Sequence, residues 1–145
     1  MTRGLSTALG YVLTLGITVI LVSGLLVAGG NFVDDQREEV VRTELEIVGE
    51  QVATHVNAAD RLNESGVGET NVTIEQRFPP SVVGSAYRIN LEEDDQRLRL
   101  KTTNPSVEVT VPLASTTTIA DSSASGGQIV VEYDRGQDAV VIDSA

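Results

Sequence analysis

The chain has 145 residues, among them ten basic and twenty-one acidic side chains, one histidine, and no cysteine or tryptophan. This length suits one domain with an appendage, and the absence of cysteine excludes a disulfide framework and a thiolate metal site. The formal charge of −11 argues against nucleic-acid binding, because contact with phosphates requires clustered Lys and Arg. The single histidine, His55, has no second histidine with which to form a metal centre, so we expect no metal, no cofactor and no enzymatic activity.

The charged residues are unevenly distributed along the chain. Residues 4–33 contain no Asp, Glu, Lys or Arg, and this run is longer than the about 20 apolar residues that cross a bilayer. We therefore predict a transmembrane helix over residues 5–33. The alternative is a core helix of a soluble protein, which seldom lacks charge on every face. Arg3 precedes the run and four acids follow it between residues 34 and 39, so the positive-inside rule predicts a single-pass protein with a cytoplasmic N-terminus and an extracellular C-terminal domain.

A short motif stands directly before this uncharged run. Its residues are Arg3, Gly4, Leu5 and Ser6. A basic and a small residue placed before a long uncharged helix, in a very acidic chain, resemble the class III signal peptide of archaeal, and in particular haloarchaeal, type IV pilin-like proteins. The resemblance implies that a prepilin peptidase cuts between Gly4 and Leu5, which makes residues 1–4 a cytoplasmic leader. Leu9 departs from the bacterial pattern, in which the fifth mature residue is usually Glu.

The resemblance implies an assembly function. A type IV pilin-like subunit, major or minor, waits in the membrane with residues 5–33 as its helix, and a pilus assembly ATPase and a platform protein then extract it into a cell-surface filament, the pilus. There the same helix contacts other pilin subunits, and the C-terminal domain serves adhesion. Two alternatives remain open: a signal-anchored surface protein that does not polymerise, and a secreted binding module cut at an ordinary signal site near residues 28–30.

The next segment, residues 34–65, has the periodicity of an amphipathic helix stalk. Its apolar residues recur at steps of three and four, which places them on one face. They are Val41, Leu45, Val48, Val52, Val56, Ala59 and Leu62. Two glycines within residues 63–68 predict the end of this helix. The apolar face packs either on the chain's own C-terminal domain or in part on neighbouring subunits, and His55 is predicted to be a surface residue at its edge.

Residues 66–145 are predicted to form an extracellular β-rich domain, because apolar and polar residues alternate there as in strands with one buried face. The predicted strands are residues 71–78, 87–91, 97–101, 107–111, 128–133 and 139–142. The acidic turn at residues 92–95 predicts an antiparallel hairpin, and residues 116–127, rich in small polar residues, predict an exposed loop or edge. The whole chain is thus predicted to have an α+β fold, a long helix followed by a small antiparallel sheet or sandwich.

Few residues of the C-terminal domain are candidates for a site. The acids of residues 92–95 carry oxygen ligands suited to a hard cation, but they lack EF-hand spacing and we expect them to be solvated. Asn63 and Asn71 begin N-x-[ST] sequons on the predicted outer side and are candidate N-glycosylation sites. The acids are spread from residue 34 to residue 143, which favours a salt-adapted, halophilic surface over an acidic patch for one basic partner.

Overall fold

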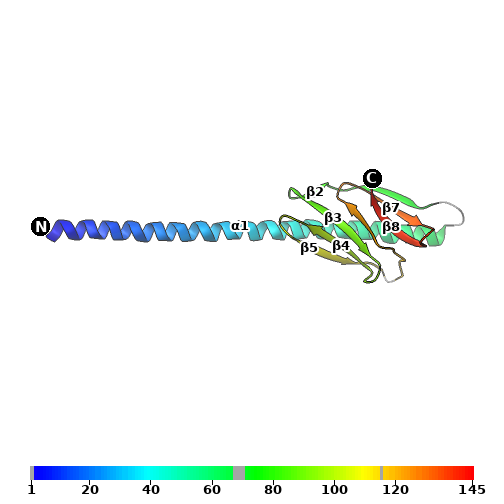
Figure 1. Cartoon of the computed structure of the whole chain (residues 1–145), viewed down its shortest axis with the longest axis horizontal. Helices are drawn as coiled ribbons and strands as arrows, with labels where there is room; N and C mark the ends of the chain where they lie inside the picture. The colour runs from blue at the N-terminus through cyan, green and yellow to red at the C-terminus, as the bar shows by residue number, and fades with distance from the viewer. Residues whose placement is uncertain (1, 67–70, 115) are drawn as a thin grey trace. The chain divides into compact units, whose positions relative to one another are not determined.

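The computed structural model, drawn in Figure 1, describes residues 2–66, 71–114 and 116–145. Within these ranges one helix, α1 (Thr2–Ser65), is followed by eight strands. The predicted α+β fold is confirmed, because a long apolar helix precedes antiparallel sheets. By the contacts among their residues, Met1–Gln36 and Arg37–Ala145 form two separate compact units.

The helix α1 is unbroken along its 64 residues. No proline occurs before Pro79, so every position of the helix keeps its backbone donor. At the C-terminal end the Gly66 N–H donates a hydrogen bond to the Asn63 carbonyl (3.2 Å). The predicted helix end within residues 63–68 is therefore confirmed, although residues 67 and 68 themselves lie outside the described residues.

The strands form two sheets in which neighbouring strands run antiparallel. They are β1 (Thr73–Arg77), β2 (Ser81–Val82), β3 (Ser85–Glu92), β4 (Arg97–Thr102), β5 (Glu108–Pro112), β6 (Ser122–Ser125), β7 (Gln128–Asp134) and β8 (Ala139–Ser144). One sheet has the order β1–β7–β8, and the other has the order β2–β3–β4–β5 with β6 also paired to β3. The predicted hairpin is confirmed as β3–β4, whose register pairs Glu92 with Arg97.

Strand β6 joins the two sheets. It pairs with β3, and its Ser122 Oγ accepts a hydrogen bond from the Ile142 N–H of β8 (3.0 Å). The prediction of an exposed loop or edge over residues 116–127 is confirmed in part. Among the described strands β6 pairs with β3 alone and is an edge strand, but the segment is not exposed throughout, because it contributes to the core. Its buried residues are Thr117, Ile119, Ala120 and Ala124. Ser and Ala have little strand preference of their own, and pairing with β3 determines the conformation here.

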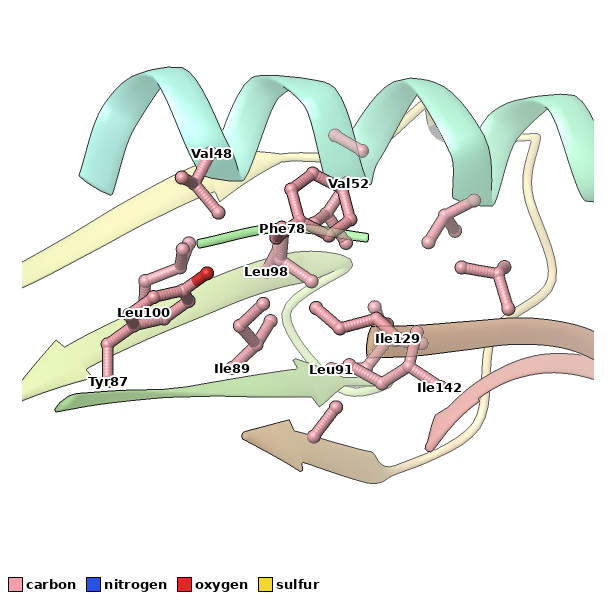
Figure 2. Packing of buried hydrophobic residues seen from close by; sticks show 14 of the residues in the cluster. Val48, Val52, Phe78, Tyr87, Ile89, Leu91, Leu98, Leu100, Ile129 and Ile142 are labelled. Carbon is pink, nitrogen blue, oxygen red and sulfur yellow. The ribbon is translucent and has the colours of Figure 1, made fainter. Parts of the chain in front are cut away.

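The core of the second unit lies between α1 and the two sheets (Figure 2). The predicted apolar face of the helix points inward, and its buried residues are Val41, Leu45, Val48, Val52, Val56 and Ala59. In Figure 2, Val48 and Val52 lie on the side of the helix that faces the sheet. The interpretation that this face packs on the chain's own domain is confirmed for these six residues. Leu62 is the exception, at 52 % exposed.

Two residues show how closely α1 approaches the sheet. Gly49 is buried, and a Cβ added to it would lie 2.7 Å from Val111 Cγ2 and 2.8 Å from Leu100 Cδ1. The ring of His55 is half-buried and meets the ring of Phe78 edge-on, with 6.2 Å between the centroids. The histidine is thus an aromatic packing residue at the helix–sheet boundary, less exposed than the surface position predicted for it.

Candidate functional site: the exposed apolar segment of α1

Residues 5–33, here called the apolar segment, form a helix with no protein cover. Sixteen large apolar side chains in this segment are at least half exposed, from Leu5 (76 %) to Val33 (64 %). Burying one such side chain contributes about 1.5–3 kcal/mol, so covering all of them would contribute on the order of 25–50 kcal/mol. A continuous apolar surface of this size marks a membrane or protein contact.

Three threonine hydroxyls of the apolar segment are hydrogen-bonded to backbone carbonyls of α1 itself. The Thr14 hydroxyl donates to the Gly10 carbonyl (2.8 Å), and the Thr18 hydroxyl donates to the Thr14 carbonyl (2.8 Å). Thr7 does the same with the Arg3 carbonyl (3.0 Å). Hydroxyls satisfied within the helix need no water, which is the condition for placing them in hydrocarbon.

Among the described residues α1 is the one helix long and apolar enough, by length and composition, to cross a membrane. The uncharged run of residues 4–33 would extend about 45 Å at the helical rise per residue, against a hydrocarbon core of about 30 Å. None of the apolar window is buried inside the protein, unlike the core helix of a soluble domain. The segment is therefore compatible with a single-pass membrane anchor.

The four residues of the N-terminal motif lie in the first turns of α1, and all of them are exposed. Gly4 has no atom within 4 Å of the position that a Cβ would occupy. Gly4 therefore tolerates a larger side chain without a clash in the folded chain. Any requirement for a small residue between Arg3 and Leu5 would have to come from a molecule that binds this end of the helix.

The model of a family of unknown function, DUF7266, matches residues 1–143. The chain belongs to DUF7266. No curated protein and no solved structure matches it significantly.

The two sequons of this DUF7266 chain differ in their surroundings. Asn71 is exposed and lies two residues before the start of β1. Asn63 is half-buried at the end of α1, and its side chain hydrogen-bonds with Tyr133. The Tyr133 hydroxyl also donates to Asp138 Oδ1 (2.7 Å), and this bond is the main cause that raises the pKa of Tyr133 to about 12. Asn71 is therefore the more accessible of the two candidate glycosylation sites.

A polar cluster fixes the C-terminal end of α1 to the segment before β6. Thr117 Oγ1 donates to Asn57 Oδ1 (3.0 Å), and the neighbouring Asp60 is buried. Desolvation is the largest cause that raises the pKa of Asp60, and the negative charge of Glu64 adds to it. Hydrogen bonds from Thr118 and Thr117 act in the opposite direction. These hydrogen bonds join α1 to the segment before β6.

The acidic turn between β3 and β4 is partly paired. Glu92 Oε2 lies 3.0 Å from Arg99 Nη2, and the Glu93 N–H donates to Asp121 Oδ1 (2.8 Å). Asp94 and Asp95 are exposed. Across residues 2–66, 71–114 and 116–145, no three His, Cys, Asp or Glu side chains are grouped so that they could hold a metal ion.

The five-stranded sheet of the DUF7266 chain has a charged outer face that the sequence interpretation did not single out. In β4, Arg97, Arg99 and Lys101 alternate with buried leucines and so point away from α1. Arg88 points the same way from β3, where both its neighbours are buried. We call these four residues the basic face. The sequence signal for this face was the spacing of Arg97, Arg99 and Lys101 in β4, because residues i, i+2 and i+4 of a strand share one face.

Proposed function

We propose that this chain is a type IV pilin-like subunit of the archaeal, haloarchaeal kind, anchored in the membrane before it assembles into a cell-surface filament. The observation that carries the proposal is the uncovered apolar segment, which begins directly after Arg3 and Gly4 and continues into a helix that forms the core of the head domain. The apolar surface of such a helix has to be buried in lipid or against other apolar helices. A pilin helix is buried in lipid before assembly and against other pilin helices after it.

In the proposed sequence of events, a prepilin peptidase first removes residues 1–4, which lie in the cytoplasm. The mature chain then begins at Leu5 and remains in the membrane with its head domain outside. An assembly ATPase and its platform protein move subunits from lipid into a bundle of apolar helices. Both environments cover the same side chains with apolar atoms, so hydrophobic burial is retained during the transfer.

Glycines in the apolar segment suit a close helix bundle. Gly10, Gly16 and Gly24 have no atom within 4 Å of an added Cβ, so their surfaces are free in the single chain. Small residues let neighbouring helices approach closely inside a membrane or a bundle. The proposed function requires contacts of this kind and requires no catalysis by the chain. The head domain, with its acidic surface, would face solvent of high salt and provide adhesive contacts.

The decisive experiment is N-terminal sequencing of the mature protein from its native host, together with isolation of surface filaments. We expect the mature chain to begin at Leu5 and to occur in filaments. Arg3→Ala and Gly4→Leu should both block processing, and Gly4→Leu should leave the fold intact because its side chain meets open space. Thr2→Ala is the matched control, adjacent to Arg3 but outside the motif, and should be processed normally.

The other two functions predict different mature termini. A chain that still begins at Met1 would indicate a signal-anchored surface protein that does not polymerise. A chain that begins near residues 30–31 would indicate a secreted binding module and would overturn the pilin proposal. A chain that begins at Leu5 but is absent from purified filaments would indicate an accessory subunit in place of a filament component.

A further inference from the structure

The basic face carries unneutralised positive charge on a strongly acidic protein. The chain has a net charge of −11, yet four cations on this face are accompanied by only two acids of the same strands, Glu92 and Glu108. Both of these acids pair with Arg99, at 3.0 Å and 3.6 Å. Within the described ranges, Arg88, Arg97 and Lys101 form no ion pair. The face is therefore suited to an acidic partner.

Two of these cations face each other across a strand pair. Arg88 of β3 is directly opposite Lys101 of β4, an arrangement in which like charges destabilise a sheet. On the other side of β3, Ser125 of β6 is opposite Arg88. These residues line an open cavity of about 290 Å³ together with Thr103. Two cations and the hydroxyl-bearing Thr103 and Ser125 thus border a space large enough to admit a carboxylate, and a carboxylate there would relieve the repulsion.

A complementary acidic surface lies on α1 of the same unit. Glu39, Glu46 and Glu50 are exposed, and each precedes a buried valine of the core by two residues, a rotation of about 200° around the helix. The three carboxylates therefore share one exposed side of α1, which borders the packed face, since the buried Ala53 follows Glu50 by three residues and Glu46 by seven. We call them the acidic row.

We propose that the basic face of one copy binds the acidic row of a second copy. The two surfaces have similar lengths: Arg97 to Lys101 spans about 13 Å along a strand, and Glu39 to Glu50 spans about 16 Å along a helix. They are two different surfaces of the unit, because the basic face is the outer face of the sheet and the acidic row lies on α1, which packs on the inner face. A contact between two different surfaces is heterologous, and this is the kind of contact from which open filaments are built. The inference deepens the proposed function and rests on it.

The experiment uses cysteine cross-linking of the full chain in detergent, which the cysteine-free sequence makes specific. One preparation carries Ser125→Cys beside Arg88, and the other carries Thr43→Cys, which is exposed and lies on the acidic row between Glu39 and Glu46. The matched control is Gln51→Cys, exposed on the same helix but about 100° around from Glu50. After mixing and oxidation, we expect about tenfold more disulfide-linked dimer with Thr43→Cys than with the control.

Charge exchange then tests the chemistry of the contact. Arg88→Glu with Lys101→Glu, added to the Ser125→Cys chain, should lower the yield to that of the control. Glu46→Lys with Glu50→Lys, added to the Thr43→Cys chain, should restore the yield with the reversed partner. A neutral pair, Arg88→Gln with Lys101→Gln, should also reduce cross-linking, and it should leave the melting temperature equal or higher because it removes two like charges that face each other.

Equal yields for Thr43→Cys and Gln51→Cys would overturn the proposal, as would a charge exchange that fails to restore cross-linking. Binding of polygalacturonate that depends on Arg88 and Lys101, without specific cross-links, would assign the basic face to an acidic polysaccharide instead. The experiments distinguish a failure of the proposed contact between copies from a failure of the proposed pilin function. Filaments of chains that begin at Leu5, but that show no such cross-link, would refute only the contact between copies.

Discussion

Replacement of Gly49 by alanine tests how closely α1 packs on the five-stranded sheet. An added Cβ would lie 2.7 Å from Val111 Cγ2 and 2.8 Å from Leu100 Cδ1, whereas carbon atoms in contact prefer about 3.5–4.0 Å. In an exposed helix this change stabilises by about 1 kcal/mol, but overpacking a core costs about 1–3 kcal/mol. Leu100 is fully buried and Val111 has a stiff, branched side chain. We therefore expect Gly49→Ala to lower the free energy of unfolding by about 1 kcal/mol.

The assay is denaturant unfolding of the full chain in detergent, monitored by circular dichroism. The slope of the free energy of unfolding against denaturant concentration should be the same for the variant and the wild type. A loss of 1 kcal/mol corresponds to a decrease of about 4–8 °C in Tm for a domain of this size. Val111→Ala in the same chain should recover part of the loss, with a coupling energy of at least about 0.5 kcal/mol. Gly30→Ala, which meets no atom within 4 Å, is the control and should leave unfolding of the second unit unchanged. A Gly49→Ala variant more stable than the wild type would refute the close approach.

Three further changes test other parts of the domain. Because burial and Glu64 raise the pKa of Asp60, its ionised form destabilises the folded domain. Asp60→Asn should therefore raise Tm at pH 7, and the gain should disappear below about pH 4, where the carboxyl is protonated in both states; a gain that persists at pH 3 would contradict this. Val83 has a left-handed φ of 48°, a conformation that costs a β-branched residue about 1 kcal/mol. Val83→Asn should therefore raise Tm by several degrees. An unchanged or lower Tm would show that the turn is unstrained. In protein from the native host, Asn71→Gln should remove the mass of one glycan in mass spectrometry. Asn63→Gln should leave the mass of attached glycan unchanged, because the Asn63 side chain is already hydrogen-bonded to Tyr133. The opposite pattern would show that the accessibility of the asparagine does not select the glycosylation site.

Most of the alternating strands were predictable because they have one buried and one exposed face; β1 has a half-buried residue, Ile74, in place of a buried face. The prediction of residues 97–101, for example, differs from β4 by one residue. β2 and β6 were missed for different reasons. β2 has only two residues, too few to show a period, and it exists because the chain turns back at Val83 and Gly84, which both have positive φ. β6 has the sequence SSAS, in which only pairing with β3 selects an extended conformation.

The candidate site was predictable in one respect and not in another. The apolar segment was located from the sequence because the absence of charge over residues 4–33 is a local property. The basic face combines β3 with β4, and the position of Arg88 opposite Lys101 depends on the register of the hairpin. The sequence indicates that a hairpin forms, but the exact partners follow from the turn and the buried side chains.

The core of the second unit, Arg37–Ala145, combines residues from the N-terminal and C-terminal ends of its sequence. Val41 and Val56 of α1 share one cluster with Val140 and Ile142 of β8. At the usual pace of translation, the helix exists for on the order of 10 s before β8 has been synthesised. During this time the core face of α1 has no complete pair of sheets to cover it, in addition to the apolar segment, which has no cover within the chain. The core face of α1 is therefore a second apolar surface, which is exposed during synthesis and becomes buried only when residues 139–144 are available to pack on it.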